Sequence, residues 1–306
     1  MTYHDPALLE EVLRWIDPRP LGIYVDCTVG GGSHAEGILV TVAGRASLLG
    51  LDRDPEAIAA AKTRLAPYGA AVHLHRTPFS RLTEAARAEG FAAADAILFD
   101  LGVSSAQIDR GERGMSYRVD APLDLRMDPT EGETAADLLA RLDEGELVDL
   151  LRRYGEEPRA RAIARRIARA PQSPRTTAEL AALVREVAPY PVEKTLSRVF
   201  QALRIAVNGE LEELEAALPQ AVELLAPGGR LLAISYHSLE DRIVKEFVRQ
   251  EAKGCLCPPR FPVCVCGRAP RLEVLSRRAI RPTPEEVTRN RRARSARLRV
   301  ARRLPS

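Results

Sequence analysis

The sequence lacks two patterns that would direct it into or across a membrane. It contains no run of about 18 apolar residues, as a membrane-spanning helix requires, and no charged leader followed by a short apolar stretch. Cysteine is also scarce, with five residues of which Cys27 stands far from the other four. An odd, unevenly spread set argues against the disulfide framework of a secreted protein. We therefore expect a soluble, cytoplasmic protein.

The positive charge is concentrated near the C-terminal end. The formal net charge is +3, but residues 277–303 hold eleven arginines against Glu285 and Glu286, a local charge of +9 that leaves −6 for the remainder. Such a basic segment favours a polyanion such as RNA as a partner. The alternative is a solvated, partly disordered tail. No RNA-binding module such as an RRM or KH motif is visible.

Short apolar runs punctuated by glycine or aspartate alternate with helical patterns in the first hundred residues. The runs, which indicate buried strands, are 22–28, 44–52, 70–77 and 95–102. One of the intervening helices is predicted to begin with Asp54 as N-cap and Pro55 in the first helical position. This alternation predicts an α/β fold with a parallel sheet and crossover helices.

From about residue 134 to 217 the pattern is helical throughout, and a glycine turn, a strand and a helix follow. We therefore expect a Rossmann-like sheet domain interrupted by an all-helical insertion. Its predicted parts are a first sheet segment, an inserted domain for substrate recognition, and a second sheet segment with the basic C-terminal tail, at residues 1–108, 109–217 and 218–306.

The stretch DCTVGGGSH, residues 26–34, indicates a cofactor loop. Gly30, Gly32 and Ala35 satisfy G-x-G-x-x-A between a strand and a helix, and Asp52 ends the next predicted strand. Bare backbone lets a nucleoside approach, and an acid at the second strand accepts hydrogen bonds from ribose hydroxyls. Asp26, just before the glycines, suits a cationic amino-acid group and would repel a pyrophosphate. This favours S-adenosylmethionine (SAM), with a nicotinamide oxidoreductase as the alternative.

Seven blocks of the sequence resemble the RsmH (MraW) methyltransferases. They run in the family's order from residue 24 to 300 and are YVDCTVGGGSH, GLDRDP, LFDLGVSSAQID, PLDLRMD, FQALRIAVNGELEEL, ISYHSLEDRIVKEF and RNRRARSARLRV. The resemblance implies SAM-dependent methylation of the N4 amine of a cytidine, position 1402, in 16S rRNA. The implied partner is 16S rRNA in a small-subunit ribosomal particle, and a homodimer stays open. A non-catalytic binder of RNA that retains a SAM fold is the rival interpretation.

The same resemblance implies a set of cofactor-binding residues, namely Gly32, Ser33, His34, Asp52, Phe79, Asp100 and Gln107. Ser33 departs from the family pattern, which commonly has glycine there. Phe79 is expected to stack on adenine or else to belong to the core, and His34 is alternatively a helix cap. The exocyclic amine needs positioning and a hydrogen-bond or proton acceptor. Asp100 is the first candidate for that catalytic role and Asp109 the second. Residues 235–238 are expected to close the opposite side of the crevice that holds the methyl donor and the cytidine.

Two further clusters stand out. Arg161, Arg165 and Arg169 fall at i, i+4 and i+8 of a predicted helix, which indicates either an RNA-binding face or an ordinary charged outer face. The segment CLCPPRFPVCVC places Cys255, Cys257, Cys264 and Cys266 in two C-x-C pairs that we expect to lie close together. No metal is required by the chemistry. The pairs are a candidate zinc site, although C-x-C is tighter than the usual C-x-x-C, and a loop of reduced thiols is the alternative.

Overall fold

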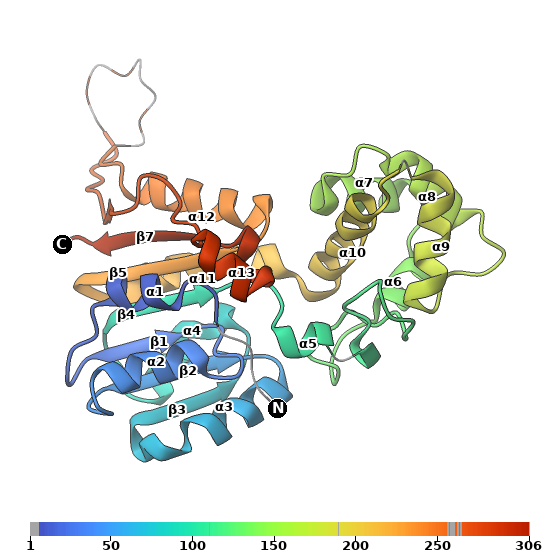
Figure 1. Ribbon diagram of the computed structural model, residues 1–306. Coiled ribbons are helices and arrows are strands. Elements are labelled where there is room, and N and C mark those ends of the chain that lie inside the picture. Colours follow the sequence, from blue (N-terminus) through green and yellow to red (C-terminus); the bar gives the residue numbers. More distant parts are fainter. Residues whose placement is uncertain are drawn as a thin grey trace. The chain divides into compact units, whose positions relative to one another are not determined.

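The computed structural model describes residues 6–109, 111–188, 190–255, 257, 261, 263 and 265–305. The chain folds into two compact units (Figure 1). One comprises Met1–Gly102 with Leu211–Ser306, and the other is Val103–Glu210. Within the described residues, no helix is long and apolar enough to cross a membrane.

The first unit is built on a seven-stranded sheet in the order β3-β2-β1-β4-β5-β7-β6. The strands are β1 (Ile23–Asp26), β2 (Ser47–Asp52), β3 (Val72–Arg76), β4 (Ala94–Asp100), β5 (Leu225–Ser235), β6 (Leu272–Val274) and β7 (Arg297–Arg303). The first five are parallel to one another, whereas β7 runs antiparallel to both β5 and β6. This confirms the predicted α/β class.

Helices cover both faces of the sheet (Figure 1). One buried core joins the sheet to α4 (Leu82–Ala88), α11 (Glu210–Leu224) and α12 (Ser238–Glu251). The other joins it to α1 (Leu9–Ile16), α2 (Ser33–Thr41) and α3 (Pro55–Leu65). As expected, α3 begins with Asp54 as N-cap and Pro55 in its first turn. The doubly covered sheet leaves the carboxyl ends of its parallel strands as the edge where ligands bind in such folds.

The boundaries of the helical unit differ from the predicted ones, 109 and 217. The compact units divide at residues 102 and 210, so most of α11 belongs with the sheet. The reason is that Leu214, Ala217 and Leu218 of this helix are buried in the core of the sheet. Helical periodicity alone does not show which core a helix contacts.

The basic C-terminal segment is largely folded, so the alternative of a partly disordered tail is wrong for it. Its residues form α13 (Pro284–Arg289), the short η4 helix (Arg291–Ser295) and β7. In β7, Leu298 is fully buried, while Arg299 pairs with Asp241 of α12 at 2.6 Å. Arg302 pairs with Glu273 of β6. Part of the positive charge is therefore neutralised within the fold.

The second unit is helical around its own buried core. Its helices are α5 (Ser105–Asp109), the short η3 (Gly111–Arg113), α6 (Ala135–Arg141), α7 (Glu144–Gly155), α8 (Ala160–Ala168), α9 (Thr177–Val187) and α10 (Glu193–Asn208). Thr134, Asp143 and Thr176 begin α6, α7 and α9 with capping boxes. In each, the N-cap side chain accepts the backbone N–H of the N3 residue, and the N3 carboxylate accepts the backbone N–H of the N-cap residue. Local sequence signals thus set where these helices start.

Candidate active site

Three aspartates lie at the carboxyl ends of neighbouring parallel strands. Asp26 ends β1, Asp52 ends β2 and Asp100 ends β4. Because β1 lies between β2 and β4 in the sheet, all three side chains come to one edge. Asp26 is 1% exposed and the Asp100 side chain 23%. The sheet therefore gathers three carboxyl groups with little access to water.

Burial raises the pKa of each of these carboxyl groups. The pKa rises to about 6 for Asp26 and Asp52 and to about 7 for Asp100, in each case chiefly through desolvation. Asp100 and Asp52 add to the shift of Asp26, because like charges disfavour ionisation. In the described part of the chain, no lysine or arginine forms an ion pair with any of the three. Arg53 nearby offsets part of the pKa shift of Asp52. The three carboxyl groups still give the edge a negative charge, which suits a positively charged ligand.

The glycine loop adopts backbone conformations that favour glycine. Gly30 and Gly32 have φ of +51° and +82°, and Gly32 is the N-cap of α2. The Gly30 N–H donates to Asp52 Oδ2 at 3.0 Å, and the Asp54 N–H donates to Asp52 Oδ1 at 2.9 Å. The loop is therefore hydrogen-bonded to the acid of the second strand, a contact that was not predicted from the sequence.

His34 is buried on α2 and does not cap it, so the alternative of a capping histidine is wrong. Its Nε2 lies 3.1 Å from the Ala7 carbonyl oxygen, which can only accept, so Nε2 carries the proton. Burial lowers the pKa of His34, so the ring is neutral near pH 7. Its Nδ1 lies 3.7 Å from Asp100 Oδ2. Ser33, the first residue of α2, is half-buried.

Tyr236 contacts the third acid directly. Its hydroxyl donates to Asp100 Oδ1 at 2.9 Å, and burial raises the pKa of the phenol well above its ordinary value, so it stays a donor. Sequence reasoning included this residue only within the segment 235–238 and assigned it no role. The following His237 caps α12, and Glu240 accepts the backbone N–H of Tyr236 at 2.9 Å. The helix start thus orients the tyrosine toward Asp100.

Phe79 lies just after β3, in the short η2 helix (Phe79–Arg81). Its ring packs edge-to-face on Phe99, with centroids 5.8 Å apart, and it is only partly buried. Gln107 and Asp109 belong to α5 in the helical unit. The Gln107 side chain accepts the Ser104 N–H at 2.9 Å, and Asp109 is exposed. The roles expected for these three residues stay predictions.

The family model for the MraW methylase family matches residues 1–304. The chain belongs to this family. A MraW relative from Thermomicrobium roseum, ribosomal RNA small subunit methyltransferase H, is 50% identical over 307 residues, covering 99% of this chain and 94% of the relative. A protein of the same name from Heliobacterium modesticaldum is 48% identical over 309 residues and covers 99% of both. Membership of the MraW family confirms the predicted methyltransferase activity, with SAM as its cofactor.

Solved structures also align with this MraW protein, at low identity. An rRNA methylase from Streptococcus thermophilus aligns with a TM-score of 0.42 and 11% identity, covering 97% of this chain and 94% of that one. The N-methyltransferase NodS from Bradyrhizobium japonicum aligns with a TM-score of 0.43 and 10% identity, with the same coverage. Because both TM-scores are low, the α/β assignment rests on the strand order and the helices of this structure alone.

Proposed function

We propose that this protein methylates the exocyclic N4 amine of a cytidine in 16S rRNA, at position 1402, with SAM as donor. The observation that carries the proposal is the group of three strand-end aspartates, of which Asp26 is buried and Asp52 and Asp100 are partly buried, because it provides negative charge where a sulfonium and an ammonium would bind. The names of the relatives, which specify small-subunit rRNA, support the choice of substrate.

The residues at this edge fit SAM. Asp52, already fastened to the glycine loop, has further lone pairs for the ribose hydroxyls, and Asp26 would face the ammonium of the methionine part. Positive φ at Gly30 and Gly32 keeps side chains out of the turn. Phe79, partly buried after β3, would contact adenine. When bound, SAM supplies an activated methyl group on a positively charged sulfur.

Asp100 is the group best placed to accept the proton that the amine releases. Cytosine N4 is a poor nucleophile because its lone pair is delocalised into the ring, so orientation and a nearby acceptor supply much of the catalysis. A carboxyl group with a pKa of about 7 is half ionised at neutral pH and can take a proton. Tyr236 holds one Asp100 oxygen, which leaves Oδ2 for the substrate. An unpaired cytidine should be preferred, because unstacking a base costs a few kcal/mol.

Methyl transfer to small ribosomal subunits tests the proposal. Subunits from cells lacking this protein are incubated with the purified chain and tritiated SAM, and digested rRNA is analysed by mass spectrometry. We expect N4-methylcytidine at one position. Retention of RNA without methyl transfer would support the non-catalytic rival. Label on carbon 5 of cytosine, or on another nucleotide, would refute the N4 assignment.

The Asp52→Ala variant should bind SAM about tenfold more weakly or worse, because hydrogen bonds to a charged group contribute about 1.5–3 kcal/mol. Calorimetry of both proteins measures the loss. The matched control is a SAM analogue without ribose hydroxyls, which should bind wild type and variant with similar affinity. Unchanged SAM affinity in the variant would remove the ribose assignment, and equal losses for both ligands would place the defect in the glycine loop.

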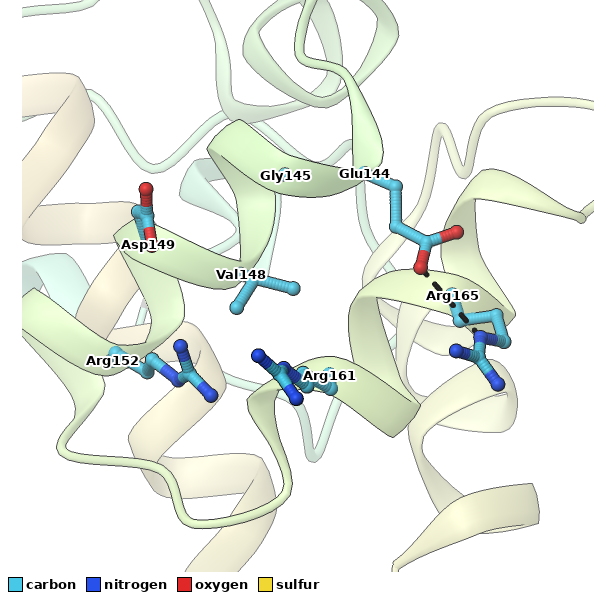
Figure 2. Close-up of a pocket in the computed structure, with 7 residues that line it drawn as sticks. All are labelled: Glu144, Gly145, Val148, Asp149, Arg152, Arg161 and Arg165. Carbon is cyan, nitrogen blue, oxygen red and sulfur yellow. Dashed lines mark ion pairs between the residues drawn. The ribbon is translucent and has the colours of Figure 1, made fainter.

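The helical unit carries a hollow between α7 and α8, with a volume of about 420 Å³, whose lining includes three arginines and the acids Glu144 and Asp149. Arg152 of α7 and Arg161 of α8 point toward one another across it, and Val148 also lines the hollow (Figure 2). Arg165 instead turns to Glu144, at 3.6 Å. Facing guanidinium groups repel one another unless an anion lies between them. We infer that the hollow takes a phosphate of the rRNA backbone.

The double variant Arg152→Gln/Arg161→Gln should bind RNA several-fold more weakly, with a smaller salt dependence. For single strands, each lost phosphate contact reduces the slope of log affinity against log salt by about 0.7. The control is Arg166→Gln on the same helix, since Arg166 already pairs with Glu186. Filter binding over a salt series measures all three proteins. An unchanged slope in the double variant would exclude the hollow as a phosphate site.

A further inference from the structure

The loop between α12 and β6 is closed at its base by ion pairs and a backbone hydrogen bond. The Arg271 N–H donates to the Glu251 carbonyl at 2.8 Å. The Glu251 carboxylate also accepts from the guanidinium groups of Arg268, at 2.6 Å, and Arg271, at 2.5 Å. Burial would raise the pKa of Glu251, but these two cations outweigh it and hold the pKa below its ordinary value. The two legs of the loop therefore start side by side.

Three cysteines from the two legs lie together above this base. Cys255 and Cys257 come from the leg that leaves α12, and Cys266 comes from the leg that returns to β6. Their three Sγ atoms all lie within 4.8 Å of one another. Cys264, the other member of the predicted cluster, lies outside the described residues. The structure thus brings three of the four predicted residues to one point.

The distance between two of the three sulfurs matches a tetrahedral metal site. The Cys255 and Cys266 Sγ atoms are 3.8 Å apart. A disulfide requires about 2.05 Å. Zinc–sulfur bonds of about 2.3 Å at tetrahedral angles set neighbouring sulfurs about 3.8 Å apart. Among the described residues, none of these cysteines forms a disulfide.

The apolar side chains that the structure describes in this loop offer little burial that could hold its legs in place. Phe261, Val263 and Val265 are 53%, 70% and 73% exposed. Long loops are uncommon in compact domains and often have a function. A donor set made only of thiolates selects soft or borderline metals, and zinc is the usual choice for a site without redox chemistry.

We propose that Cys255, Cys257 and Cys266 bind a structural zinc ion that joins the two legs of this loop. Binding exchanges the thiol protons for the metal, so the three sulfurs bind as thiolates and the protons are released to solvent. Structural zinc takes four ligands, so one further donor completes the site. Since every proposed ligand lies in the loop, the ion acts on the loop and takes no part in methyl transfer.

Metal analysis tests this proposal on the full chain purified without chelator. We expect about one zinc per chain in the wild type and in the Val265→Ala control, which alters an exposed side chain between ligands, and well under one in Cys255→Ser/Cys266→Ser. Cobalt exchanged into the wild type should give thiolate-to-cobalt charge-transfer absorption, and the double variant should not. If that variant fails to fold, alkylating the wild-type thiols should release the zinc.

Several results would overturn the proposal. They are reduced wild-type protein with well under one zinc per chain, iron in place of zinc, or a disulfide between Cys255 and Cys266. Full zinc retention by a folded double variant, or by wild type with alkylated thiols, would place the metal elsewhere.

Discussion

Replacing Asp100 with asparagine should lower the single-turnover rate of methyl transfer by about a hundredfold or more, the scale of a lost general base. The affinity for SAM should change little. Asparagine is nearly isosteric with aspartate, and its Oδ1 can still accept the hydrogen bond from Tyr236. The variant therefore removes the proton acceptor and keeps its position. Rapid-quench assays with labelled SAM measure the rate, and calorimetry measures the affinity.

If Asp100 accepts the proton, its pKa determines how the rate of methyl transfer depends on pH. Only the ionised carboxylate accepts a proton, and the pKa of Asp100 is about 7. The wild-type rate should therefore rise about tenfold per pH unit below pH 7 and level off above it, whereas the residual rate of the variant should lack this limb. In Tyr236→Phe the limb should move to higher pH, because the tyrosine hydrogen bond lowers the pKa of Asp100.

Two results would contradict the role of Asp100. A wild-type rate in Asp100→Asn would exclude proton transfer to this carboxylate. A collapse of SAM affinity that matches the loss of rate would reassign Asp100 to cofactor binding. In Tyr236→Phe, a lower rate with no shift of the pH limb would show that the tyrosine acts other than through Asp100.

The parallel half of the sheet could be predicted from sequence because each strand is a buried apolar run that ends in a turn residue. The antiparallel strand β7 was missed. The start of its sequence, RLRV, alternates charged and apolar residues as a half-buried strand does, but the density of arginine in residues 277–303 was interpreted as a basic tail. In the structure Leu298, Val300 and Ala301 are buried, and Asp241 and Glu273 pair with Arg299 and Arg302. These partners lie far away in the sequence, so local patterning does not identify them.

The candidate site also has residues that could be predicted from sequence and residues that could not. Asp26, Asp52 and Asp100 were predicted because the carboxyl ends of parallel strands share one edge. Residues 235–238 were also expected at this edge, but the hydrogen bond of Tyr236 to Asp100 was not predicted. Arg152 was missed because it faces Arg161 only when α7 packs on α8. Sequence spacing instead selected Arg169, which the structure does not place at the hollow.

Replacing Asp26 with asparagine should make the free protein more stable at pH 8 and, at the same time, weaken its binding of SAM. Burial raises the pKa of Asp26 from 3.8 to about 6. The native state thus binds the Asp26 proton more tightly than the unfolded chain, and the stability this provides is complete below pH 3.8 and lost as pH rises through about 6. Asparagine is neutral at every pH and still accepts the Thr28 N–H, so it avoids that loss.

The expected gain in the free energy of unfolding at pH 8 is up to about 3 kcal/mol, since each pKa unit corresponds to about 1.4 kcal/mol. The gain should shrink toward zero near pH 4, where wild-type Asp26 is protonated in the native state. Urea unfolding of both proteins at pH 4 and pH 8 measures this gain.

SAM affinity should fall about tenfold or more at pH 8, because a charge-assisted hydrogen bond is lost. A damaged fold would weaken both stability and binding, so a more stable variant that binds SAM poorly would identify Asp26 as a carboxylate kept for the cation. A variant less stable than wild type at pH 8, or a gain independent of pH, would contradict this.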